Sequence, residues 1–441
     1  MIDRDPAWVA AAAGGRLVAG GPRGPGPRRA TVDSRELERG DLFVGLVGAR
    51  ADGGRFAREA LEAGAWGALV GPSRARELSE RGVPGVVIEA GNTLVALQRL
   101  ARAWRRELGC PVVGVTGSTG KTSTKDILRA LLSQSLRTEA NRENWNTEIG
   151  LPLSLLAAQR ATEALVLEMA MRGEGQIAEL AAIAEPDVGV IVNVGPVHLE
   201  LLGTVERVAA AKAELIRDLR AGATCVVPAR DPLLRPHLRD DLRTITFGEG
   251  GEVRLVSFED GRAEIDAGDE RISLELPYAE PHNLLNTLAA VAAATAIGVM
   301  PRGRVEPAFS SYRGEVVELD GGVTVVNDCY NANPMSMRAA LDHLASTRAE
   351  RRVAILGTMA ELGPDSRRFH REIGAHAAEL GVDVLVTVGD DALAFGEGFR
   401  GEMHSVATPE EAGALLEEMA RPGDRVLVKG SRAVGLERVL A

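Results

Sequence analysis

PVVGVTGSTGKT, residues 111–122, joins a short run of valines to a glycine turn and a Lys-Thr pair. The valines predict a buried strand, and apolar residues spaced along 127–132 predict the helix that follows. Gly117 and Gly120 leave backbone N–H groups able to face phosphate oxygens, and the helix N-terminus and Lys121 add positive charge. A threonine hydroxyl at this place is suited to Mg²⁺. The stretch therefore predicts a loop that binds the phosphates of a nucleoside triphosphate, made of Thr116, Gly117, Ser118, Thr119, Gly120, Lys121 and Thr122.

The loop is shorter than the pattern G-x-x-x-x-G-K-[ST], because Val115 occupies the position of the first glycine. The alternative interpretation is an ordinary strand-to-helix turn with an exposed lysine.

Length and composition indicate a soluble protein of several domains. At ~150 residues per domain, 441 residues predict about three domains. The net charge of -11 disfavours nucleic acid and anionic membranes as partners. Cys110, Cys225 and Cys329 lie far apart in the chain, which favours a reducing compartment over a disulfide framework. With neither a signal peptide nor an apolar run long enough for a membrane span, we expect a cytoplasmic protein without membrane insertion.

The order of the predicted elements indicates an α/β protein with three domains. Residues 1–107 form a small N-terminal α/β domain, and residues 108–307 form a central domain with a parallel sheet of the P-loop ATPase type. Within the central domain, the polar–apolar alternation of 245–277 predicts a small antiparallel ribbon. Residues 308–441 alternate strands and helices, which predicts a Rossmann-like, doubly wound sheet.

Two polar side chains follow predicted strands of the central domain. Glu168 comes directly after the strand 164–167, and His198 follows the strand 188–194. Open α/β sheets bind ligands at the carboxyl ends of their strands, and a carboxylate there suits Mg²⁺. The alternatives are a surface glutamate at a strand end and a structural histidine.

Lys212 lies on the apolar face of a helix predicted over 204–219, at helical spacing from Val208 and Leu215. Such a lysine usually extends its amine to solvent. A buried amine, however, has a lowered pKa and a neutral fraction available for covalent chemistry.

Several loops carry polar residues whose role the pattern leaves open. The asparagine cluster at Asn144, Asn146 and Thr147 is typical of a turn, and it also lies soon after the phosphate-loop helix. Ser34-Arg35 fits a diphosphate contact and a capped turn equally well. In the third domain, the predicted strand ends carry 328–334, 357–363 and 429–432.

Together these residues resemble the Mur ligases, the ATP-dependent amide-forming enzymes of peptidoglycan precursor synthesis. The resemblance covers essentially the whole chain. It is carried by Thr116 to Thr122, Glu168, His198, Lys212, His282-Asn283, Arg313 and the loop that begins at Asp328.

Within this family, the stretches 328–334, 359–363 and 428–432 are similar to the member that joins D-alanyl-D-alanine to UDP-N-acetylmuramoyl-tripeptide. The chain lacks the Asp-Asn-Pro-Arg type of stretch typical of the diamino-acid-adding member. That ligase and a folate polyglutamate-type ligase are the alternatives within the superfamily. A nucleotide-gated switch built on the same loop is the alternative of another class, and the absence of an Asn-Lys-x-Asp motif disfavours it as a GTPase.

The resemblance implies ATP, two Mg²⁺ ions and a Lys212 carboxylated to a carbamate as cofactors, in a protein that acts as a monomer. It implies that Lys121, Glu168, His198 and Lys212 are catalytic. Thr122 and Glu168 bind one Mg²⁺, His198 and Lys212 serve the second, and Asn283, Arg313 and Asp328 contact the nucleotide. The implied substrate-binding residues are Ser34, Arg35, Asn144, Asn146, Thr147, Tyr330, Asn331 and Lys429.

The resemblance also divides the work among the domains. The first binds the UDP part, the second binds ATP, and the third binds the dipeptide and closes on ATP. The chain departs from the family in three places: Thr147 replaces a second asparagine, Thr358 replaces a common acidic residue, and Ser311-Tyr312-Arg313 replaces Pro-Gly-Arg.

Overall fold

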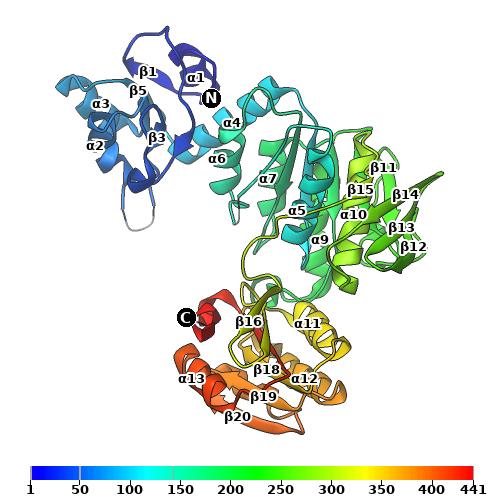
Figure 1. Ribbon diagram of the computed structural model, residues 1–441. Helices are drawn as coiled ribbons and strands as arrows, with labels where there is room; N and C mark the ends of the chain where they lie inside the picture. The colour runs from blue at the N-terminus through cyan, green and yellow to red at the C-terminus, as the bar shows by residue number, and fades with distance from the viewer. Residues whose placement is uncertain (1, 49–50, 143, 441) are drawn as a thin grey trace.

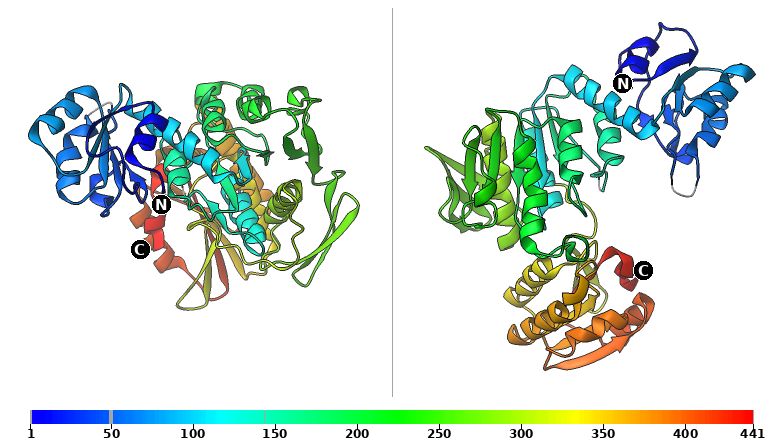
Figure 2. Two further views of the ribbon diagram at one scale, coloured as in Figure 1. Left: turned by 90° about the horizontal axis from the view of Figure 1, so that it is seen from above. Right: turned by 180° about the vertical axis from the view of Figure 1, so that it is seen from behind.

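The computed structural model describes residues 2–48, 51–142 and 144–440. It contains one sheet of 5 strands, one of 10 and one of 6, each within its own part of the chain. We call these parts the N-terminal, central and C-terminal units. Figure 1 shows the N-terminal unit in blue to the left of the central unit and the C-terminal unit in yellow to red below it, and Figure 2 shows the same separation from behind.

The N-terminal unit has the strand order β1-β5-β4-β3-β2, which is parallel except for the antiparallel β1–β5 pair. The long helix α4 (Thr93–Leu108) leads from this unit to the central one and packs on α6 and α7. The other elements are α1 (Pro6–Ala12), β1 (Arg16–Ala19), β2 (Ala30–Thr31), η1 (Ser34–Glu36), β3 (Leu42–Val44), η2 (Gly53–Phe56), α2 (Ala57–Glu62), β4 (Gly67–Val70), α3 (Pro72–Arg81) and β5 (Val86–Glu89).

The central sheet runs β15-β14-β13-β12-β11-β10-β9-β6-β8-β7. Its elements are β6 (Val112–Thr116), α5 (Lys121–Ser133), β7 (Thr138–Ala140), α6 (Gly150–Ala157), β8 (Ala164–Glu168), α7 (Gln176–Ala184), β9 (Val188–Ile191), α8 (Leu199–Leu202), α9 (Val205–Asp218), β10 (Thr224–Pro228), η3 (Arg235–His237), β11 (Arg243–Phe247), β12 (Val253–Glu259), β13 (Arg262–Ala267), β14 (Glu270–Glu275), α10 (Pro281–Ala296) and β15 (Gly303–Arg304).

Strand β6 lies inside the parallel part of this sheet, between β8 and β9. Its side chains are buried on both faces, which explains the continuous valine run. Val113 and Val115 pack with α5 and α10 on one face, and Val112 packs with α4 and α7 on the other. The predicted antiparallel ribbon is confirmed as β12-β13-β14.

The C-terminal sheet has the order β16-β17-β21-β18-β19-β20 and is parallel except for the edge pair β16–β17. Helices cover both faces, as predicted for a Rossmann-like unit. Its elements are β16 (Glu315–Leu319), β17 (Val323–Asn327), α11 (Pro334–Ser346), β18 (Arg351–Gly357), η4 (Gly363–Asp365), α12 (Ser366–Glu379), β19 (Val384–Val388), η5 (Asp390–Phe395), β20 (Glu402–Val406), α13 (Pro409–Met419), β21 (Asp424–Lys429), η6 (Arg432–Val434) and η7 (Leu436–Leu440). None of the helices in the described ranges combines the length and apolar character that a bilayer crossing requires.

Candidate active site

A cavity of about 1050 Å³ is lined by loops of the central and C-terminal units. Many residues singled out from the sequence meet there although some are more than three hundred positions apart in the chain. The predicted residues in its lining are Ser118, Thr119, Gly120, Lys121, Thr122, Asn144, Asn146, Thr147, Glu168, His198, Asn283, Arg313, Asp328, Tyr330, Asn331 and Lys429. Thr116, Gly117 and Lys212 are not part of the cavity lining, and Ser34 and Arg35 lie in the N-terminal unit.

The phosphate loop requires glycine at its end. Gly120 has φ 74°, and a Cβ there would lie 2.4 Å from Oδ1 of the buried Asn286. Helix α5 begins one residue later, so its first N–H groups have no partner within the helix and suit an anion.

Asn193, two residues after β9, binds the backbone of this loop. Its Oδ1 accepts hydrogen bonds from the backbone N–H groups of Ser118 at 3.1 Å and Thr119 at 2.9 Å. Its amide also donates to the Thr119 hydroxyl at 3.0 Å. These two loop amides are therefore engaged within the protein, whereas the sequence predicted that the loop amides face phosphate. Asn193 was missed because it lies within the stretch 188–194 that the sequence predicted as a continuous strand, whereas β9 ends at Ile191.

Two lysine amines donate hydrogen bonds to the same backbone carbonyl of the phosphate loop. Nζ of Lys121 lies 2.8 Å and Nζ of Lys212 lies 2.9 Å from the oxygen of Gly117. Burial lowers the pKa of Lys121, and burial together with the charge of Lys121 lowers the pKa of Lys212 well below its ordinary value. The predicted position of Lys212 on the apolar face of its helix is confirmed, and of the two alternatives that the sequence left open, the structure has the amine buried. Two buried amines this close repel each other, so an anion placed between them and the cavity is favoured.

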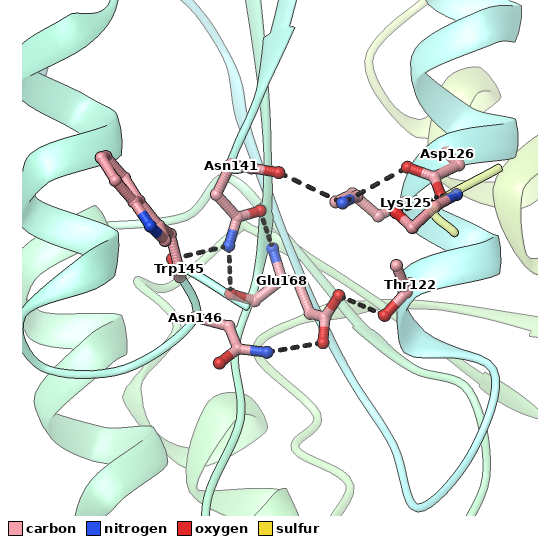
Figure 3. A network of polar contacts seen from close by, with 8 residues as sticks. Thr122, Lys125, Asp126, Asn141, Trp145, Asn146 and Glu168 are labelled. Atoms are coloured by element: carbon pink, nitrogen blue, oxygen red, sulfur yellow. Dashed lines mark hydrogen bonds and ion pairs between the residues drawn. The ribbon is translucent and has the colours of Figure 1, made fainter. Parts of the chain in front are cut away.

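Glu168 ends β8 with its carboxylate buried beside the loop (Figure 3). The Thr122 hydroxyl donates to Oε2 at 2.7 Å, and the amide of Asn146 donates to Oε1 at 2.8 Å. The hydroxyl and the carboxylate form a hard oxygen donor set that fits Mg²⁺. Asn146, predicted to contact substrate, here holds the carboxylate.

Asn141 joins the asparagine loop to the backbone of Glu168 (Figure 3). Its Oδ1 accepts from the N–H of Glu168 at 2.8 Å, and its amide donates to the carbonyl oxygens of Glu168 and Trp145, each at 3.0 Å. Lys125 donates to the backbone oxygen of Asn141 at 3.1 Å. No local pattern of the sequence indicates that the side chain of Asn141 supports the carboxylate.

The wall from the C-terminal unit is built around Arg313 and Lys429. The guanidinium of Arg313 lies 4.1 Å from the ring centre of Tyr330, and its Nε is buried without a partner among the described residues. Nζ of the buried Lys429 lies 2.5 Å from the carboxylate of Asp328 and 3.1 Å from the backbone oxygen of Asn331. Lys429 therefore ties two strand-end loops together within the wall.

Asn283 lies at the start of α10 on the other side of the cavity. Its amide nitrogen lies 3.3 Å from the carboxylate of Glu280, and its amide oxygen lies 3.3 Å from the amide nitrogen of Asn286. Asn286 also lies against Gly120, so it connects Asn283 to the end of the phosphate loop.

His198 joins the central unit to the C-terminal unit. Its Nδ1 hydrogen-bonds the carboxylate of Glu361, which follows β18. Burial lowers the pKa of His198, although Glu361 favours the charged imidazole, and the bond to His198 lowers the pKa of Glu361. The family resemblance implied a metal role for His198 and no role for Glu361.

Ser34 and Arg35 form part of the short helix η1, away from this cavity. The Arg35 guanidinium is exposed and donates to the Asp33 carboxylate, which lowers the pKa of Asp33 to about 2. The capped turn is present, since Asp33 also accepts from the Arg35 N–H at 2.9 Å.

The residues around Glu168 fit a cation whose remaining ligands are water and substrate phosphates. In the part of the chain that the structure describes, no three side chains among His, Cys, Asp and Glu gather to hold a metal. Mg²⁺ is commonly bound by one or two carboxylates together with water and substrate phosphates, so one carboxylate and one hydroxyl beside a phosphate loop suffice.

Comparison with known proteins places the chain in a family. The model of the Mur ligase middle domain matches residues 115–294, and that of the Mur ligase glutamate ligase domain matches residues 312–432. A UDP-N-acetylmuramoyl-tripeptide–D-alanyl-D-alanine ligase from Synechocystis is 39% identical over 428 residues, which cover 93% of this chain and 90% of the relative. The chain belongs to the Mur ligase family.

Solved structures of Mur ligases share the three-unit architecture. MurF from Acinetobacter baumannii matches with a TM-score of 0.86 and 28% identity, covering 98% of this chain and 96% of the other. MurF from Thermotoga maritima, determined in complex with ADP, matches with a TM-score of 0.79 and 34% identity, covering 94% and 96%. The Mur ligase fold predicted from the sequence is confirmed over nearly the whole chain.

Proposed function

We propose that this protein is the ATP-dependent ligase that joins D-alanyl-D-alanine to UDP-N-acetylmuramoyl-tripeptide in peptidoglycan precursor synthesis, with release of ADP and phosphate. The observation that carries the proposal is the match, along 93% of the chain, to a ligase of that name. The site agrees with it, because a phosphate loop and the signature loops of the C-terminal unit line one cavity.

The reaction has to activate a carboxylate, which is a poor acyl donor. The terminal carboxylate of the tripeptide attacks the γ-phosphorus of ATP, and ADP leaves as an acyl phosphate forms. The amine of D-alanyl-D-alanine then attacks the acyl carbon, and the tetrahedral intermediate collapses to the amide and phosphate. Phosphoryl transfer asks the protein chiefly for positioning and charge neutralisation, which Lys121 and the first N–H groups of α5 provide.

Thr122 and Glu168 would hold Mg²⁺, which supplies charge neutralisation at the phosphates. Asn146 and Asn141 fix the Glu168 side chain and backbone, so the carboxylate is oriented before substrates bind.

We assign Lys212 as the residue carboxylated by CO₂ to a carbamate that serves, with His198, a second Mg²⁺. The support is its burial and its lowered pKa, because only a neutral amine adds to CO₂. The anionic product would also remove the repulsion between Lys212 and Lys121 at the Gly117 carbonyl.

The remaining assignments divide the substrates among the units. Asn283, Arg313 and Asp328 contact the nucleotide, and the unpaired Nε of Arg313 supports this role. Asn144, Asn146, Thr147, Tyr330, Asn331 and Lys429 lie near the peptide substrates, and Ser34 and Arg35 contact the UDP part. The domains are 1–107 for UDP, 108–307 for ATP and 308–441 for the dipeptide.

A comparison of acceptors tests the proposal. Purified protein with ATP, Mg²⁺ and UDP-N-acetylmuramoyl-tripeptide is offered D-alanyl-D-alanine, D-alanine, L-lysine or diaminopimelate, and a second series replaces the tripeptide by the dipeptide. We expect ligation product only with D-alanyl-D-alanine on the tripeptide. Preference for a single amino acid on the shorter peptide would assign the chain to another member of the superfamily.

A further inference from the structure

His198 and Glu361 meet where the central and C-terminal units touch. The Nδ1 of His198 is bonded to Oε2 of Glu361, and Nε of Arg172 lies 3.4 Å from the other carboxylate oxygen. The backbone also joins the units here, since the N–H of Glu200 donates to the carbonyl of Glu361 at 3.2 Å. A side-chain pair and a backbone hydrogen bond therefore link the same two loops.

Both partners have a backbone conformation that ordinary residues rarely adopt. His198 has φ 53° and Glu361 has φ 62°, and neither is glycine. Left-handed non-glycine residues persist only where their surroundings enforce them, and they concentrate at functional sites. Two such residues whose side chains bond each other across a unit boundary indicate that this pairing is built into the fold.

In a neutral imidazole, the nitrogen that donates its hydrogen to Glu361 determines that the other ring nitrogen is unprotonated. A neutral imidazole that donates Nδ1–H to a carboxylate keeps Nε2 unprotonated, with its lone pair available. His198 lines the cavity beside the phosphate loop. We propose that Glu361 is a positioning residue, supplied by the C-terminal unit, that fixes the tautomer and orientation of His198 so that an unprotonated Nε2 is available in the cavity.

This inference rests on the proposed function only for the use of His198 in catalysis, so its first test needs no substrate. The chain has 7 histidines, and selective ¹⁵N labelling makes each imidazole observable. The His198 signals are assigned by their loss in His198→Gln, at a pH where the imidazole is neutral. We expect the Nδ1–H tautomer in the wild type and in Glu361→Gln, whose amide oxygen still accepts a hydrogen bond. Glu361→Ala should shift His198 toward the Nε2–H form.

Glu200→Ala is the matched control, because it removes an exposed carboxylate from the adjacent helix α8 and leaves the backbone bond in place. His198 should keep its tautomer in this variant. An unchanged His198 tautomer in Glu361→Ala, or an Nε2–H tautomer in the wild type, would overturn the proposal.

Steady-state kinetics supply the second test. Loss of a carboxylate that orients a histidine typically lowers activity 10–100-fold. We therefore expect kcat to fall by about this factor in Glu361→Ala, with partial recovery in Glu361→Gln and an unchanged KM for the UDP-linked substrate. A kcat of Glu361→Ala equal to that of the wild type contradicts the inference. A wild type that performs no ligation but shows the expected tautomers contradicts the proposed function alone.

Discussion

At the scale of single residues, the site is an arrangement of buried polar groups that hold one another in place. Glu168 is fixed at its side chain by Thr122 and Asn146, and at its backbone by Asn141. Lys121 and Lys212 share one carbonyl oxygen, and their lowered pKa values follow from burial. A buried polar group without a hydrogen-bond partner destabilises the folded protein, so a substitution that removes one partner should lower stability or activity.

Asn141→Ala should lower the free energy of unfolding by about 2–3 kcal/mol, because it leaves the N–H and carbonyl of Glu168 and the carbonyl of Trp145 without this partner. Urea denaturation measures the change. The exposed Asn144, substituted by Ala in the same loop, should change the stability by less than about 0.5 kcal/mol. Equal effects of the two substitutions would show that Asn141 is not a structural support of Glu168.

Lys212→Met should abolish most ligase activity without loss of folding, since it replaces a buried amine by an apolar chain of similar length. Protein incubated with ¹³C-bicarbonate should show a carbamate resonance by NMR in the wild type and none in this variant. A wild type without that resonance, but with full activity in CO₂-free buffer, would refute the carbamate.

For helices and strands, success in predicting an element from the sequence depends on how clearly its apolar residues repeat at helical or strand spacing. The sequence of helix α4 (Thr93–Leu108) predicts a helix, because Leu94, Leu97, Leu100 and Trp104 repeat at helical spacing. Helix α6 was missed because GLPLSLLA is almost uniformly apolar and contains Gly and Pro, so it shows no helical period. The site residues differ in the same way. Glu168 was found because it ends a strand with a clear apolar pattern. Asn193, Asn286 and Glu361 were not found, because they act through contacts that no local pattern encodes.

Helices α4 and α7 are joined by an ion pair that predicts a pH dependence. The carboxylate of Glu185 accepts hydrogen bonds from Arg106 and Arg102, which lower its pKa from 4.5 to about 2. A lowered folded-state pKa stabilises the protein above the ordinary pKa, and this contribution is lost as the pH falls through about 4.5 toward 2. Because the arginines are exposed, we expect about 1 kcal/mol at pH 7.

Urea denaturation of the wild type and Glu185→Gln between pH 3 and pH 7 measures this contribution. The difference in unfolding free energy should shrink as the pH falls. Glu417→Gln, which changes an exposed carboxylate of α13, should show no such trend. A difference that stays constant with pH would exclude the ion pair as its source.

At the scale of the whole molecule, the cavity is divided between two units that are joined by a single stretch of chain near residues 305–314 (Figure 1). Asp126 of α5 accepts hydrogen bonds from the N–H and hydroxyl of Ser310, each at 3.1 Å, which fixes this stretch to the central unit. The three-domain architecture was predictable from the order of strands and helices, but the meeting of His198 with Glu361 was not.

Because the nucleotide contacts that we propose are divided between these units, ATP should draw them together and exclude water from the acyl phosphate. Small-angle X-ray scattering with a non-hydrolysable ATP analogue and Mg²⁺ should give a smaller radius of gyration than the free protein. ADP without a tripeptide provides the comparison for partial closure. A radius of gyration that does not change with any nucleotide would contradict closure.

Formation of an acyl phosphate is tested by following one oxygen atom of the tripeptide. The tripeptide substrate is labelled with ¹⁸O in its terminal carboxylate and incubated with ATP, Mg²⁺ and D-alanyl-D-alanine, and the released phosphate is analysed by mass spectrometry. Transfer of the carboxylate oxygen through an acyl phosphate should place one ¹⁸O atom in the phosphate for each amide bond formed, and Lys121→Ala should give neither labelled phosphate nor amide. Amide formation with unlabelled phosphate would contradict it.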